Sequence, residues 1–123
     1  MENIKLGTRQ KSLIEALRST KYKQAKEVMC NGRNCFCVVG LILFLSGDFK
    51  THSVGKQNKF ELVHKKNKKT RYNIFDDDDG SYFNLTDKAL FDLINLNDAA
   101  GKSFKEIALE LETNPNEYFS DTI

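Results

Sequence analysis

The stretch that most constrains the fold is VVGLILFL, residues 38 to 45, in which no side chain carries a charge. A helix or strand of this sequence is apolar on every face, so other elements of the protein must surround it. The uncharged run around it, residues 34 to 47, is apolar over only about ten residues, whereas a membrane-spanning helix needs roughly 20. We therefore expect a buried central helix, with a buried strand as the alternative.

Helical patterns lie on both sides of this run. Thr8, Thr86 and Ser103 stand where three amphipathic helices would be capped. The second helix should end at Asn95, and Pro115 should end the third because proline cannot continue a helix. The apolar positions at helical spacing are Leu13, Ile14 and Leu17 in the first, Ala89, Leu90, Leu93 and Ile94 in the second, and Phe104, Ile107, Ala108 and Leu111 in the third.

The middle of the chain has β character. In KEVMCNGRNCFC, the pair Asn31-Gly32 tolerates the positive φ angles of a type I′ turn, which predicts a hairpin. Two β-like segments, KFELVH (59–64) and TRYNIF (70–75), are joined by KKNKK and predict a second hairpin with a basic tip. With helices at both ends, a buried central helix and one or two hairpins between, we expect a single α+β domain spanning residues 1–123.

The composition is that of an ordinary globular protein. The 19 basic and 17 acidic side chains leave a net charge of +2, so any electrostatic argument about partners must be local. The opening MENIKLGTRQ lacks the cationic stretch followed by an apolar one that marks a secretory signal. Three cysteines, an odd number, fit reduced thiols better than disulfides. We expect a cytoplasmic protein with no membrane partner.

The segment LNDAAGKSFKEIALELE, residues 96–112, resembles the end of a nucleotide-binding phosphate loop. That loop requires G-x-x-x-x-G-K-S/T, and Leu96 stands where its first glycine belongs. Ser103 and Glu106 instead form the S-x-x-E pattern of a capping box, in which each residue satisfies a backbone N–H of the other. The favoured interpretation is a structural turn that starts the last helix.

A ligand site in the same turn is the alternative, because a helix N-terminus beside a lysine attracts anions even without the full motif. Asn97 and Asp98 lie shortly upstream and are able to line the same surface. The ligand-binding candidates are Asn97, Asp98, Lys102 and Ser103, together with Cys37.

Cys37 precedes the apolar run, where a helix N-terminus would lower the pKa of its thiol. A cysteine nucleophile also needs a base, and His52 and His64 are the only histidines. The favoured interpretation is a small buried residue, since free cysteine is among the most buried residue types.

Metal binding has little support in the sequence. Cys30, Cys35 and Cys37 follow C-x4-C-x-C, which is not a zinc-site spacing. The run DDDDG, residues 76–80, would place phenylalanine and threonine where a calcium loop requires acidic ligands. We expect no metal and no cofactor.

A basic segment runs from Lys56 to Arg71 and holds seven Lys or Arg, with Phe60, His64 and Tyr72 in or beside it. Such a segment is typical of a nucleic-acid surface. It is equally typical of an exposed hairpin tip that charge keeps soluble, and the acidic run that follows weakens the local field. The nucleic-acid candidates are Lys65, Lys66, Lys68, Lys69 and Arg71.

Three segments carry a family resemblance: EALRSTKYKQ (15–24), FCVVGLIL (36–43) and LNDAAGKSFKEIALELE (96–112). They resemble small proteins of unknown activity encoded by tailed bacteriophages and some bacteria. Members of that family show A-L-R-S-G-x-Y-x-Q near the start, F-C-x-L-G-x-L in the centre and L-N-D-x-x-G-K-S-F-x-E-I-A near the end. This chain departs at Thr20, where glycine is common, and at Val39, where leucine is common.

The resemblance implies a phage origin and an accessory role, and it assigns no catalysis. We therefore expect a non-enzymatic protein that binds a host macromolecule or a small signalling ligand in the host cytoplasm, with counter-defence as one setting. A cysteine- or nucleotide-dependent enzyme is the first alternative. A nucleic-acid-binding protein that uses the hairpin at residues 56–71 is the second.

Overall fold

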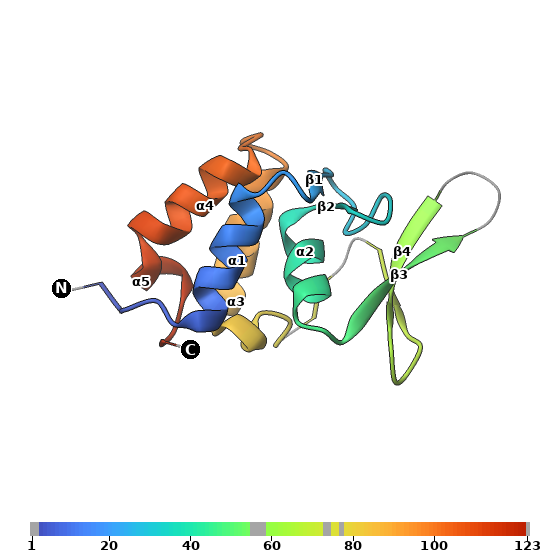
Figure 1. Ribbon diagram of the computed structural model, residues 1–123, viewed down its shortest axis with the longest axis horizontal. Helices are drawn as coiled ribbons and strands as arrows, with labels where there is room; N and C mark the ends of the chain where they lie inside the picture. The colour runs from blue at the N-terminus through green and yellow to red at the C-terminus, as the bar shows by residue number, and fades with distance from the viewer. Residues whose placement is uncertain (1–2, 55–58, 73–74, 77, 123) are drawn as a thin grey trace.

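A computed structural model of the chain describes residues 3–54, 59–72, 75–76 and 78–122. Four helices form a bundle at one end of the molecule, a central helix lies beside them, and a small antiparallel sheet extends from the far side of that helix (Figure 1). This arrangement confirms the expected α+β class. The elements are α1 (Thr8–Arg18), β1 (Lys23–Gln24), β2 (Cys35–Phe36), α2 (Val38–Leu45), β3 (Phe49–Val54), β4 (Lys59–His64), β5 (Thr70–Arg71), the 3-10 helix η1 (Ser81–Phe83), α3 (Asp87–Asn97), α4 (Phe104–Thr113) and α5 (Pro115–Tyr118).

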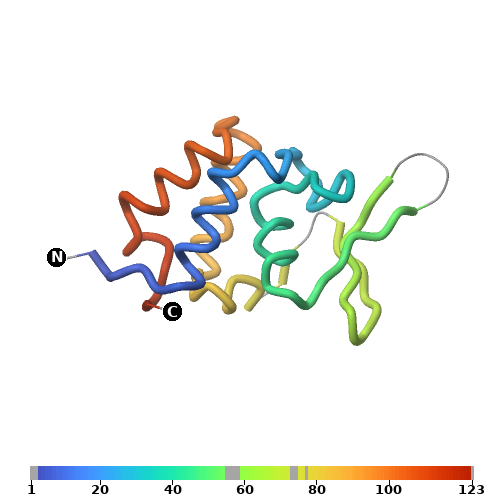
Figure 2. Tube along the Cα trace, viewed as in Figure 1, coloured from blue at the N-terminus to red at the C-terminus, as the bar shows by residue number. Residues whose placement is uncertain are grey.

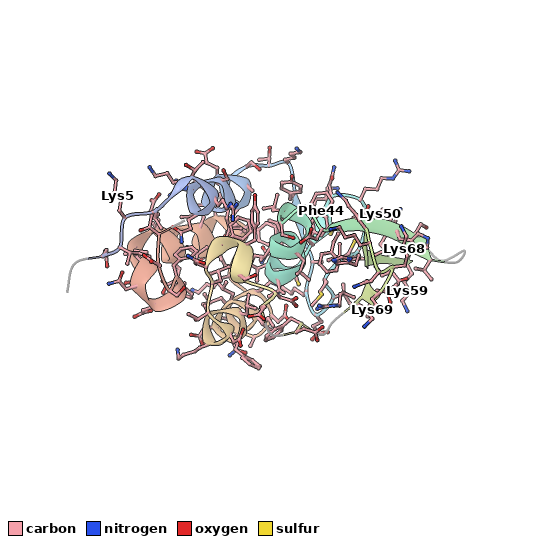
Figure 3. The ribbon with its side chains drawn as sticks, turned by 90° about the horizontal axis from the view of Figure 1, so that it is seen from below. Lys5, Phe44, Lys50, Lys59, Lys68 and Lys69 are labelled. Carbon is pink, nitrogen blue, oxygen red and sulfur yellow. The ribbon has the colours of Figure 1, made fainter. Side chains whose placement is uncertain are left out.

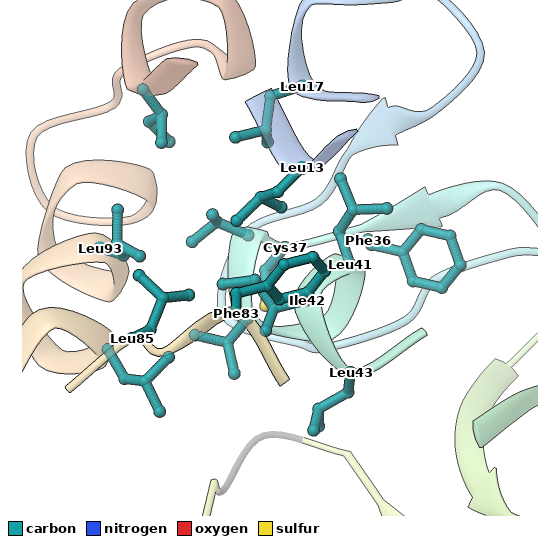
Figure 4. Close-up of a cluster of buried hydrophobic side chains, with 14 of the residues drawn as sticks. Leu13, Leu17, Phe36, Cys37, Leu41, Ile42, Leu43, Phe83, Leu85 and Leu93 are labelled. Carbon is teal, nitrogen blue, oxygen red and sulfur yellow. The ribbon is translucent and has the colours of Figure 1, made fainter. Parts of the chain in front are cut away.

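The apolar run forms helix α2, as expected, and not the alternative strand. Its first six residues are buried, and side chains from both ends of the chain surround it (Figure 4). At Gly40 the backbone of α2 packs directly against the backbone of Met29, because a Cβ at this position would collide with the Met29 carbonyl oxygen. Within the described ranges, no helix has both the length and the apolar character needed to cross a bilayer.

Helices α1, α3 and α4 appear where the periodicity predicts them. The Thr86 hydroxyl caps α3 by accepting the Ala89 N–H at 3.0 Å, as expected. Thr8 is not the cap of α1, because the helix begins at Thr8 itself and Gly7 occupies the cap position. There the side chain of Gln10, at the third helical position, accepts the N–H of the cap residue Gly7 at 2.9 Å.

The helix ends differ slightly from the expectation. Helix α3 continues to Asn97, two residues past Asn95, because the residues that follow bond back into its last turn. Helix α4 ends at Thr113, and Pro115 then occupies the first turn of the short α5, a position where its missing N–H costs nothing.

The hairpin expected at Asn31-Gly32 is wrong. A type I′ turn needs positive φ at both central residues, and among the described non-glycine residues with positive φ Asn31 does not occur. Strand β2 instead pairs in parallel with β1, and only one antiparallel bridge, between Cys30 and Phe36, closes the loop. Pairing of β2 with the earlier segment β1 therefore displaced the local hairpin.

The hairpin of β4 and β5 is confirmed, but its second strand is short. Only Thr70 and Arg71 pair with β4, and residues 73–74 of the expected strand lie outside the described ranges, as does Lys56. The sequence also missed β3, which pairs with all six residues of β4. The burial pattern of this strand, FKTHSV, does not alternate, since Phe49 alone of its six residues is buried.

The three strands form an extension of the body that we call the basic arm, residues 49–54 and 59–72 (Figure 2). One face of the sheet carries Phe49 and Leu62, which join the core. Opposite partners share a face and neighbours along a strand alternate, so Lys50 and Lys59 lie on the other face. Phe49 and Leu62 therefore anchor the arm through one face, and the other face carries Lys50 and Lys59 beside the buried Val63.

Candidate functional site

The three segments that carry the family resemblance meet at Asn97, the last residue of α3. Its side chain is fully buried, and its Oδ1 accepts the Gln24 Nε2–H at 2.9 Å and the Val38 N–H at 3.2 Å. Its Nδ2 donates to the Ala25 carbonyl at 2.9 Å and to Asp98 Oδ1 at 2.7 Å. A side-chain amide has two donor hydrogens and two acceptor sites, so protein groups use the full capacity of Asn97.

Gln24 connects this buried amide to the GKSF turn. Its Nε2 also donates to the Lys102 carbonyl at 2.7 Å, and its Oε1 accepts the Phe104 N–H at 3.1 Å. Asp98 extends the network in the other direction by accepting the Glu27 N–H at 3.0 Å. We call Gln24, Asn97 and Asp98 the polar junction, because they join β1, α2, α3 and α4.

The capping box at the start of α4 is confirmed. The Ser103 hydroxyl accepts the Glu106 N–H at 3.2 Å, and Glu106 accepts the Ser103 N–H at 3.1 Å. That bond, first among several causes, lowers the pKa of the Glu106 carboxyl. The Lys102 N–H donates to the Leu96 carbonyl at 2.8 Å. The N–H groups of Lys102, Ser103 and Phe104, which a phosphate loop would turn toward its ligand, therefore donate to protein oxygens here.

Cys37 lies at the N-cap of α2 and is buried, as the favoured interpretation predicts, and the alternative of a helix N-terminus that lowers the pKa of its thiol is not supported. Burial raises the pKa of the thiol to about 11, and the hydrogen bond from the Gly40 amide, at 3.4 Å from Sγ, offsets only part of that effect. The cavity beside Cys37 has a volume of about 30 Å³, and its lining includes Asp98 but neither His52 nor His64.

The two histidines belong to the basic arm. His52 is on β3, and His64 ends β4, where its Nδ1 accepts the backbone N–H groups of Lys66 and Asn67 at 3.2 and 3.3 Å. No cluster of three or more His, Cys, Asp or Glu residues within the described ranges is arranged to hold a metal ion. Burial is the main cause that raises the pKa of Cys30 and of Cys35.

Lys102 and Ser103 lie at the surface, away from the buried part of the junction. Lys102 Nζ is 3.8 Å from Glu106 Oε2, and both side chains line a groove of about 300 Å³ between α3 and α4. Asn97, Asp98 and Cys37 do not line that groove. The structure thus buries Asn97 and Cys37, leaves Asp98 half-buried and exposes Lys102 and Ser103.

The nucleic-acid candidates also divide into two groups. Arg71 points toward the body and forms a bidentate ion pair with Asp79, at 2.7 and 3.1 Å, and a second pair with Asp76 at 2.8 Å. The lysines of the arm are exposed, and Figure 3 shows several of them gathered at the end of the molecule opposite Lys5. The exposed lysines are Lys50, Lys59, Lys65, Lys66, Lys68 and Lys69.

Sequence reasoning missed two of these functional positions. Gln24 gives no local signal, since only the folded chain brings it to Asn97, 73 residues away. Lys50 was missed because β3 was missed. The chain thus combines a buried polar junction with an exposed basic arm, and comparison with models of protein families, with curated proteins and with solved structures finds no significant match.

Proposed function

We propose that this chain is a phage-encoded accessory protein that acts by binding a host macromolecule and not by catalysis, with counter-defence as one biological setting. The observation that carries the proposal is the basic arm, which extends from the helical body and exposes its lysines to solvent. The resemblance of three segments to small phage proteins supports the origin and the accessory role.

The polar junction also supports a function without catalysis. Asn97 and Asp98 looked like ligand or catalytic residues in the sequence, and in the folded chain both hold backbone groups of neighbouring elements. Asn97 and Asp98 do not line the groove beside Lys102, so a small signalling ligand bound in that groove would not use them. A macromolecular partner would instead bind the arm, whose lysines are already exposed.

A cysteine-dependent enzyme has less support. With a pKa of about 11, only about one Cys37 thiol in 10⁴ is ionised at pH 7. The thiolate is the nucleophile, and neither histidine lines the cavity where a base would have to act.

Site-specific photocrosslinking in bacterial host cells tests the proposal. A photoreactive amino acid replaces Ser53, an exposed residue of β3, and in a matched control it replaces Lys105, an exposed residue of α4. We expect a discrete crosslinked species from position 53 and none from position 105. Equal yields from both positions, or substrate turnover that Cys37→Ser abolishes, would overturn the proposal.

A further inference from the structure

The small net charge of the chain conceals a strong separation of charge. Residues 49–72 hold eight basic side chains and one acidic one, a net charge of +7. The remaining residues hold eleven basic and sixteen acidic side chains, a net charge of −5. Because the arm extends from the body, the positive charge gathers at one end of the molecule (Figure 3).

Hydrogen bonds order the turn that carries Lys65, Lys66, Lys68 and Lys69. In the turn between β4 and β5, His64 Nδ1 accepts two backbone N–H groups and Asn67 Oδ1 accepts the Lys69 N–H at 2.8 Å. The Lys68 ammonium donates to the Lys65 carbonyl at 2.9 Å. Within the described ranges, none of the six exposed lysines forms an ion pair with a carboxylate, so their mutual repulsion is uncompensated by the protein.

Within the described residues, the acidic run forms no ion pair with these lysines. Asp76 and Asp79 both pair with Arg71 at the base of the arm. That pairing fixes the arm to the body and leaves the lysine charges directed to solvent. The acidic run also weakens the local field along one side of the turn, as expected, because Asp78 and Asp79 line the same groove as His64 and Asn67.

The other side chains of the arm narrow the class of partner. Protein interfaces centre on aromatic and arginine anchors, and amphipathic elements enter a membrane surface through an apolar face. In the described part of the arm, Tyr72 is the one large hydrophobic side chain at the surface, with 36% of its area exposed. The Lys59 ammonium lies 4.7 Å from the centre of the Tyr72 ring, so even this ring is partly covered. Single-stranded nucleic acid is held by several stacking aromatic rings, which the arm does not offer.

The type of basic side chain, lysine or arginine, limits the class of partner further. Base reading in the major groove relies on arginine held bidentate to guanine, and the single arginine of the arm is occupied by Asp79 and Asp76. Lysines act on phosphates as point charges. A row of lysines without a free arginine suits the phosphate backbone and carries no base-specific contact.

We infer that the basic arm binds the phosphate backbone of double-stranded DNA without reading its sequence. The inference names the macromolecule of the proposed function and rests on that function. The lysine-bearing turn joins the two antiparallel strands β4 and β5, and the major groove of B-form DNA, about 12 Å wide, admits a two-stranded β-ribbon. The corresponding groove of duplex RNA is deep and narrow, which favours DNA.

Fluorescence anisotropy with a labelled 30-base-pair DNA duplex, measured from 50 to 300 mM NaCl, tests the inference. Each phosphate contact changes the slope of log association constant against log salt by about −0.9, so six lysines give a slope of at most roughly −5. The test variant carries Lys50→Ala, Lys65→Ala, Lys66→Ala and Lys69→Ala. We expect its slope to be smaller by about 3 to 4 and its affinity at 50 mM NaCl to fall about 100-fold. Lys68 is retained because it helps to close the turn.

The matched control carries the same change of charge on the helical body: Lys5→Ala, Lys11→Ala, Lys21→Ala and Lys105→Ala, all at exposed positions. We expect its affinity to stay within about twofold of the original protein, because these lysines lie away from the arm. Equal losses in the two variants would show binding by net charge alone and would overturn the inference. Thermal unfolding of both variants checks that each remains folded.

Three further probes complete the test. A duplex of shuffled sequence should bind within about twofold, and a clear sequence preference would overturn the backbone-only inference. Tighter binding to duplex RNA, to single-stranded DNA or to vesicles of phosphatidylserine and phosphatidylcholine would overturn the assignment to duplex DNA. If duplex DNA does not bind but position 53 still crosslinks to a protein, the inference fails and the proposed function stands. If neither occurs, both fail.

Discussion

At the scale of single residues, Asn97 shows how a residue in a motif that resembles a ligand site can have a purely structural role. The segment LNDAAGKS places polar residues before a helix, as a ligand site would. In the folded chain the buried amide satisfies backbone groups of Ala25 and Val38 that lie far away in the sequence. Buried backbone groups must find partners, and this requirement gives Asn97 its role without a ligand.

Substitution of Asn97 should therefore destabilise the fold. Asn97→Ala leaves the Val38 N–H and the Ala25 carbonyl without their side-chain partner, and it removes one acceptor of the Gln24 amide. Each group left unsatisfied costs about 1–3 kcal/mol. We expect a loss of about 3 kcal/mol or more in the free energy of unfolding, measured by urea denaturation. Asn95→Ala, at an exposed position of the same helix, should cost under about 0.5 kcal/mol. Similar losses in the two variants would contradict the role of the junction.

Cys37 gives a residue-scale prediction about pH. Its folded pKa of about 11 lies above the ordinary value of 9.0. The unfolded thiol therefore loses its proton first, and stability that is fully present below pH 9 is lost as the pH rises toward 11. Since a tenfold difference in proton affinity is worth about 1.4 kcal/mol, this loss amounts to roughly 2–3 kcal/mol.

The measurement compares the free energy of unfolding at pH 8, 9, 10 and 11 for the original protein and for Cys37→Ala. Other groups that titrate in this range are common to both proteins, so the difference between the two curves isolates Cys37. We expect the variant to be less stable at pH 8 and to lose less stability between pH 9 and 11. Parallel curves would show that burial does not raise the pKa of this thiol.

At the scale of elements, the sequence predicted what local patterns determine. The period of apolar residues located α1, α3 and α4, and Thr86 and Ser103 capped the last two of these helices as expected. The alternation of KFELVH predicted β4, but β3 was missed because its own pattern is weak and its pairing with β4 defines it. Asn31-Gly32 failed for the same reason, since β2 found a partner earlier in the chain.

The polar junction was beyond sequence reasoning for a related reason. Its residues were visible as separate motifs, but the bonds from Gln24 to Asn97 and Phe104 cross 73 and 80 positions of the chain. Spacing along a helix or strand gives no information about such distant partners. The basic arm was easier to predict because most of its lysines are consecutive in the sequence and needed only one hairpin to bring them together.

The ion pair between Arg71 and Asp79 anchors the arm as an element. Both side chains are largely buried, with 18% and 8% of their side-chain area exposed. Removing one partner of such a pair leaves the other charge buried and unpaired, so Asp79→Asn should cost about 2–3 kcal/mol in the free energy of unfolding. Asp79→Asn should accelerate hydrogen exchange more in β4 and β5 than in α1, because it removes the ion pair that fixes the arm to the body.

The control for this prediction is the exposed pair of Lys88 and Asp92 on α3, whose ammonium and carboxylate lie 2.8 Å apart. Exposed pairs contribute under about 1 kcal/mol, so Asp92→Asn should change stability little and leave exchange in the arm unaltered. If Asp79→Asn is as mild as Asp92→Asn, the arm is held by its apolar face alone, through Phe49 and Leu62.

At the scale of the whole molecule, the separation of charge should be visible without any biological partner. A chain of net charge +2 with evenly mixed charges would be held weakly by a cation-exchange resin at pH 7, whereas a molecule with a segment of +7 can present that segment to the resin. We expect elution at a salt concentration well above that of the variant with Lys50, Lys65, Lys66 and Lys69 replaced by alanine. The variant with Lys5, Lys11, Lys21 and Lys105 replaced has the same net charge, so retention set by net charge alone would make the two variants elute together. Retention set by the arm instead keeps this second variant close to the original protein, because its segment of +7 is intact.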